Sequence, residues 1–138
     1  MQVGFPRRDP EKLLLALQCT HTTIWLRCNR SSRWAKEGQL LGFARADSDS
    51  ALTATIWDVA VHPAWRRMGL GRALVERVVH SLLTKDVDVI TLYAEPNVVL
   101  LYEKLGFVSA KEVQDMRALA FQKTTKEGRA LIAATVAA

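Results

Sequence analysis

One stretch decides the expected fold: Val59-Ala60-Val61-His62-Pro63-Ala64-Trp65-Arg66-Arg67-Met68-Gly69-Leu70-Gly71-Arg72-Ala73-Leu74. Its apolar start is typical of a β-strand, and Pro63 ends the strand because proline cannot donate to a β-ladder. Apolar residues then recur at helical spacing from Gly71 to Leu83, with polar residues between them. The stretch therefore predicts a strand, a turn with two glycines and an amphipathic helix that begins directly at the turn.

The turn has the chemistry of an anion site. Backbone N–H groups at a helix start lack helical partners, and the helix dipole is positive there. Gly69 and Gly71 let these amides approach phosphate oxygens without an intervening Cβ, and Arg66, Arg67 and Arg72 add positive charge. A helix entry without any ligand can have the same pattern, so the turn alone does not identify a ligand.

Two common phosphate motifs are excluded. A dinucleotide fingerprint needs a third glycine where Leu74 stands, and a P-loop needs a Gly-Lys-Ser/Thr sequence that the chain lacks. The net charge of +5 also raises the question of nucleic acid. Apart from the arginines of the turn, however, the basic residues are scattered among acidic ones, which favours a local anion site and no nucleic-acid partner.

Composition and length predict one domain over residues 1–138. The chain shows no repeat or linker, and its 49% hydrophobic residues are typical of a globular protein. It has no apolar run near the roughly 20 residues that span a bilayer, and residues 5–10 interrupt any signal-peptide pattern. We therefore expect a soluble protein without a membrane partner. Cys19 and Cys28 lack metal-ligand spacing, so we expect reduced thiols and no metal.

Hydrophobic periodicity predicts a mixed α/β chain. Asp9 and Pro10 begin a short helix that reaches about Leu17, with Leu13, Leu14 and Leu17 on one face. The run 87–94 is almost continuously apolar, which favours a central strand. The expected strands are 22–28, 39–46, 51–62, 87–94, one beginning at 107–108 and a last one at 116–121. The further expected helices are 71–83, one from Glu95-Pro96 to a C-terminal glycine at Gly106, and a tail from Lys123 that is helical or frayed.

Three ordered motifs resemble the GNAT superfamily of N-acetyltransferases. Arg66 to Gly71 matches its Arg/Gln-x-x-Gly-x-Gly/Ala signature, Val61-His62-Pro63 matches its strand end, and Leu101-Tyr102-Glu103-Lys104-Leu105-Gly106-Phe107 matches its closing element. The resemblance covers about Gly4 to Phe107. It implies an α/β fold: a central, mostly antiparallel mixed sheet of about six strands flanked by helices, with acetyl-CoA in the cleft where the central strands splay.

The same resemblance implies which residues hold acetyl-CoA. The backbone of Val59, Ala60 and Val61 would pair with the pantetheine arm, and the turn would bind the pyrophosphate. The implied cofactor-binding residues are Val59, Ala60, Val61, Arg66, Arg67, Met68, Gly69, Leu70, Gly71, Arg72, Asn97 and Tyr102.

Attack of an amine on a thioester needs a base for the ammonium and an acid for the departing thiolate. The resemblance places Tyr102 as the acid; without it, a tyrosine packed on a helix face is the plainer interpretation. Glu95 and Asp58 are the candidate bases. Glu95 could instead cap a helix and Asp58 could pair with an arginine, in which case water would carry the proton. We favour Glu95, and the resemblance places a β-bulge at Asp58.

Longer matches such as Gly42-Phe43-Ala44-Arg45-Ala46 and Ala54-Thr55-Ile56-Trp57-Asp58-Val59 resemble one subgroup. It contains cyanobacterial and plant plastid enzymes described as serotonin N-acetyltransferases or as lysine and N-terminal protein acetyltransferases. Glu95 and the segment 110–116 depart from the subgroup pattern. The resemblance implies an arylalkylamine acceptor, such as serotonin or tryptamine, held by Trp57; the alternative is a protein lysine or α-amine. It also implies a plastid location in a eukaryote, otherwise the cytoplasm, and a monomer or homodimer.

Overall fold

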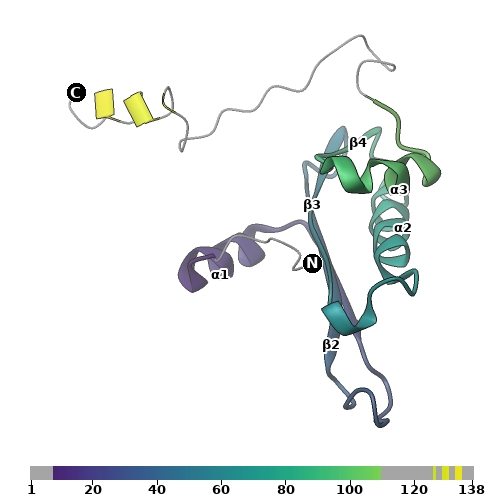
Figure 1. Ribbon diagram of the computed structural model, residues 1–138. Helices are drawn as coiled ribbons and strands as arrows, with labels where there is room; N and C mark the ends of the chain where they lie inside the picture. Colours follow the sequence, from purple (N-terminus) through teal and green to yellow (C-terminus); the bar gives the residue numbers. More distant parts are fainter. Residues whose placement is uncertain (1–7, 110–125, 127–128, 131–132, 135–138) are drawn as a thin grey trace. The chain divides into compact units, whose positions relative to one another are not determined.

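The computed structural model describes residues 8–109, 126, 129–130 and 133–134. The chain divides into two units, Met1–Leu105 and Gly106–Ala138, and each is described by itself. In the first unit the elements follow each other in the order drawn in Figure 1. They are α1 (Pro10–Cys19), β1 (Thr22–Arg27), β2 (Leu40–Ser48), β3 (Thr53–Val61), η1 (Pro63–Trp65), α2 (Leu70–Leu83), β4 (Val89–Leu92), η2 (Pro96–Val98) and α3 (Val99–Lys104).

The sheet has the strand order β1-β2-β3-β4. The first three strands pair antiparallel, and β4 joins β3 in parallel. The predicted hairpin of 39–46 and 51–62 is confirmed, and Asp49 closes its turn by accepting the amides of Ala51, Leu52 and Thr53. These three hydrogen bonds lower the pKa of the Asp49 carboxyl.

The predicted mixed α/β sheet is confirmed. The described residues form four of the about six expected strands. Residues 107–108 are not in a strand, and the expected strand at 116–121 lies outside the described residues. The run 87–94 contains β4, which pairs with β3 among the described strands.

Helix α2 covers one face of the sheet (Figure 1) and forms the core with it. The helical spacing predicted its buried residues Leu74, Val75, Val78 and Leu82. The same spacing also included Val79, which is only partly buried, and Leu83, which is 58% exposed at the end of the helix. To the buried side chains of α2 the sheet presents mainly small residues, among them the buried Ala44, Ala46 and Ala54. Gly42 shows how close the approach is, because an added Cβ would lie 2.9 Å from Leu74 Cδ1. Small residues on β2 therefore fix how near α2 lies to the strands.

Helix α1 begins as the sequence predicted and continues to Cys19. Asp9 caps it by accepting the Glu11 amide at 2.9 Å, and Pro10 occupies the first turn. At its C-terminal end the Thr20 hydroxyl donates to the Ala16 carbonyl at 2.6 Å. None of its residues is buried. In the second unit, described residues 126, 129–130 and 133–134 are helical.

Candidate active site

The parallel pairing of β3 and β4 ends in the middle of β3. Four residue pairs join the strands, and the last is Ile56 with Leu92. Val61 still pairs with Gly42 of β2, so the second half of β3 has a partner strand on one side only among the described residues. His62 N–H donates to the Leu41 carbonyl of β2 at 2.7 Å. Because backbone groups of successive residues point to opposite edges of a strand, the N–H and C=O of Val61 point away from β2. The segment Val59–Val61 thus presents backbone groups at an open edge.

A β-bulge lies at the start of this open edge. Phe43 faces Ala60 and Arg45 faces Trp57, so β3 has one more residue than β2 between these pairs. Asp58 is in the bulge and has a φ of +47°, the left-handed region that non-glycine residues rarely adopt. The bulge expected at this position is confirmed. It bends β3 just before the segment Val59–Val61.

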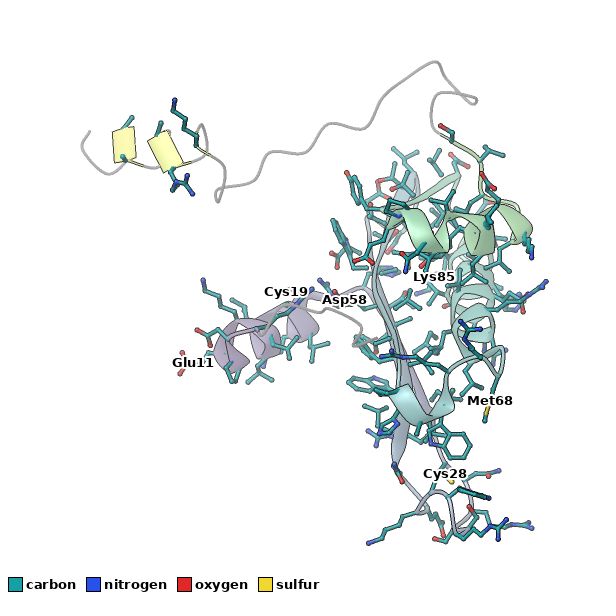
Figure 2. All side chains as sticks on the ribbon, in the orientation of Figure 1. Glu11, Cys19, Cys28, Asp58, Met68 and Lys85 are labelled. Carbon is teal, nitrogen blue, oxygen red and sulfur yellow. The ribbon has the colours of Figure 1, made fainter. Side chains whose placement is uncertain are left out.

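The Asp58 carboxylate is held by two guanidinium groups. Arg45 donates Nε to Oδ2 at 2.6 Å, and Arg8 donates Nη2 to Oδ1 at 2.5 Å. The side chains of Arg45 and Asp58 are only 11% and 14% exposed, whereas that of Arg8 is 38% exposed. In Figure 2, Asp58 lies on the sheet near the end of α1. Both carboxylate oxygens are therefore bound by arginines, as expected if Asp58 pairs with an arginine and does not act as the base.

The glycine turn leads from η1 into α2. Arg67 and Gly69 both have left-handed backbones, with φ of +60° and +77°. The Ala73 amide donates to the Gly69 carbonyl at 3.0 Å, so the amides of Leu70, Gly71 and Arg72 precede the first helical bond. Alternating left-handed residues before such amides form a concave donor array for anions. The turn therefore has the donors that a pyrophosphate needs.

The arginines of the turn have different roles. Arg66 donates Nε to the Val61 carbonyl at 3.3 Å, which links the turn to the open edge of β3. Arg72 pairs with Glu76 at 2.8 Å one helical turn later, and both side chains are more than half exposed. Arg67, Met68 and Gly69 are exposed, and Met68 marks the turn in Figure 2. Together the edge and the turn fit acetyl-CoA: an extended backbone edge is followed by an array of amide donors.

An aromatic pair stands where β3 and β4 separate. Trp57 and Tyr93 each follow the last parallel pair, and their rings stack with centroids 5.5 Å apart at 27°. Both are accessible, at 38% and 59% exposed. By strand alternation Trp57 lies on the face opposite the buried Ile56, and hence opposite α2. Sequence reasoning named Trp57 and missed Tyr93, because nothing in the sequence joins residues that are 36 positions apart.

The proposed acid and base lie on the segment that follows β4. Glu95 precedes η2, is exposed, and does not cap the helix with its side chain. Asn97 is exposed in η2. Tyr102 is partly buried in α3, and desolvation raises the pKa of its phenol above the ordinary value of 10.0. Gly106, with a φ of +95°, follows α3 at the predicted C-terminal position.

Other kinds of site find no support in the part of the chain that the structure describes. Within it, no three His, Cys, Asp or Glu side chains are grouped as metal ligands. None of its helices has the length and apolar character of a membrane span. Sequence reasoning also missed Arg45 and Arg8, because a strand pattern does not show which basic residue meets the carboxylate of a bulge.

Comparison with known proteins gives consistent matches. Residues 4–107 match the Acetyltransferase (GNAT) family. Serotonin N-acetyltransferase 2, chloroplastic, of Oryza sativa subsp. japonica is 42% identical over 91% of this chain and 60% of its own length. Histone acetyltransferase TAP1 of Glycine max is 42% identical over 80% of this chain and 49% of its own. A crystal structure from Deinococcus radiodurans R1, assigned to an acetyltransferase, superposes with a TM-score of 0.69 at 30% identity, covering 89% and 76% of the two chains. The chain spans about half to three fifths of these two plant relatives' lengths.

Proposed function

This chain belongs to the GNAT acetyltransferase family, and on that premise we propose that it transfers the acetyl group of acetyl-CoA to a primary amine. The observation that carries the proposal is the open edge of β3 at Val59–Val61, followed by the amide-rich turn before α2. An extended chain can pair with a strand edge as an added strand. A diphosphate can bind the amides at a helix start.

In this proposal acetyl-CoA supplies a thioester whose carbonyl carbon the amine attacks. The backbone of Val59–Val61 would hold the pantetheine arm and the turn 66–72 the pyrophosphate, with Asn97 and Tyr102 as further contacts. Tyr102 would donate a proton to the departing thiolate. Burial is consistent with this role, because desolvation raises the pKa of the phenol and so favours its protonated form, which has a proton to donate.

Glu95 is the proposed proton acceptor. Its side chain is exposed and free of a capping role, so it can exchange protons with water. Asp58 is less suited, because two guanidinium groups occupy both of its carboxylate oxygens. The Glu95 carboxylate would take the proton from the ammonium group of the substrate before attack, directly or through water.

The favoured acceptor is an arylalkylamine such as serotonin or tryptamine. The stacked and accessible rings of Trp57 and Tyr93 support it, because aromatic rings stack on one another with centroids about 4.5–7 Å apart. A relative named as a serotonin N-acetyltransferase points the same way. The alternative acceptor is a lysine or N-terminal amine of a protein, which the histone acetyltransferase of Glycine max favours. A plastid location is proposed from the relatives named chloroplastic.

The test measures acetyl transfer from acetyl-CoA to serotonin and, in parallel, to a lysine peptide. Gly69→Asp should abolish transfer to either acceptor, because its carboxylate would repel the pyrophosphate. Gly69→Asn is the matched control, since it has nearly the same shape and the same backbone cost at φ +77° but no charge. We expect it to keep most of the activity. Equal activity in both variants would place the cofactor elsewhere, and transfer to the peptide alone would establish the alternative acceptor.

A further inference from the structure

Arg45 is the least exposed charged partner in the network around the β3 bulge. It lies on β2 opposite Trp57, at the edge of the register shift. Its Nε binds Asp58 at 2.6 Å, its Nη1 donates to the Thr20 hydroxyl at 3.2 Å, and Asp47 lies 3.6 Å from the same Nη1. One guanidinium therefore joins the bulge, its own strand and the residue that ends α1.

The backbone of Asp58 needs such a partner. A left-handed φ of +47° is unfavourable for a residue with a Cβ and persists where surrounding contacts fix it. Regular alternation would turn the side chain after Trp57 toward α2, where a carboxylate would be buried among apolar side chains. The left-handed residue instead brings the carboxylate to Arg45. The ion pair and the bulge thus stabilise each other.

We propose that Arg45 is a positioning residue that holds the bulge through Asp58 and so keeps the segment Val59–Val61 available to acetyl-CoA. This inference rests on the proposed function, and it assigns Asp58 a structural role in place of a catalytic one. Arg8 binds the other oxygen but is more exposed, so its pairing is more strongly screened by solvent. Arg45 is the partner that fixes the conformation.

The experiment measures the dissociation constant of acetyl-CoA by calorimetry for the full chain. Arg45→Met keeps the length of the side chain and removes the charge, and it should weaken binding by about tenfold, the change that about 1.4 kcal/mol produces. Arg45→Lys should bind between the two. Arg27→Met is the matched control, because Arg27 lies on β1 and binds the Gly38 carbonyl instead of the bulge. It should bind as the wild type does.

A second variant separates positioning from catalysis. Glycine adopts positive φ without cost, so Asp58→Gly keeps the bulge without needing an ion pair. In the Asp58→Gly background, Arg45→Met should therefore change the dissociation constant by less than about twofold, a strong coupling between the two sites. The pH profile of kcat should keep its shape in Arg45→Met, since only binding changes.

Each outcome decides the proposal. A tenfold loss in the Asp58→Gly background, or wild-type binding by Arg45→Met, would overturn it. If Arg45→Met alone does not fold, the comparison of Asp58→Gly with the double variant decides. A wild-type protein that does not bind acetyl-CoA would instead refute the proposed function.

Discussion

The two halves of β3 differ in how their edges are used. Residues 54–56 pair with β2 on one side and β4 on the other, and Ala54 and Ile56 are buried under α2. Residues 57–61 pair with β2 alone among the described strands, and none of them is fully buried. The bulge at Asp58 separates the halves. One strand thus contributes its first half to the core and leaves one edge of its second half unpaired among the described strands.

The largest expected effect is a loss of stability from a substitution in the first half of β3, which pairs on both sides. Ile56 is 3% exposed, so Ile56→Ala should lower the free energy of unfolding by about 2–5 kcal/mol through lost burial and a cavity. Val61→Ala, in the second half of β3, should lower the free energy of unfolding by about 1 kcal/mol or less, since its side chain is only partly buried. Urea denaturation without ligand measures both. Equal losses would show that the halves do not differ in packing.

A smaller effect, on catalytic activity alone, is expected for Tyr102, which lies in α3 after the end of β4. Tyr102→Phe keeps the ring and removes the proton donor, so kcat should fall by about ten- to a thousandfold while acetyl-CoA binding and urea stability change little. Steady-state kinetics and calorimetry separate these quantities. An unchanged kcat would reduce Tyr102 to a packing residue.

The contribution of Tyr102 to the stability of the fold should decrease at alkaline pH. Its folded-state pKa is raised, so the contribution of the neutral phenol to stability is complete below about pH 10 and is lost as the pH rises through the folded pKa. Tyr102→Phe should remove that alkaline loss. A wild type and variant with the same alkaline stability profile would contradict the burial of the phenol.

The smallest expected effect concerns Glu95. Glu95→Gln should lower kcat/KM by about ten- to a hundredfold near neutral pH, because a positioned base is lost. The deficit should shrink toward pH 10, where an amine of pKa about 10 loses its proton unaided. Asp58→Asn should instead reduce thermal stability, since it weakens the pairs with Arg45 and Arg8. The reverse result would make Asp58 the base, and equal pH-independent losses would leave deprotonation to water.

Local patterns predicted most elements of the fold. The helical spacing after Gly71 identified the buried face of α2, and Asp9 with Pro10 identified the start of α1. The Asp49 turn and the flanking β-rich runs identified the hairpin. Each of these signals lies within a few residues along the chain. Apolar character reports burial or propensity and not which strands are neighbours, so only the structure identified β3 as the partner of β4.

The sequence by itself therefore determined the strand–turn–helix unit, the glycines at its turn and the membership in a family. It did so because φ preferences, dipoles and amphipathic spacing act between near neighbours. Only the tertiary structure decided that Asp58 pairs with Arg45 and Arg8, that Tyr93 stacks on Trp57, and that β4 leaves β3 after Ile56. These contacts join residues far apart in the chain, and register, bulge and strand order bring them together.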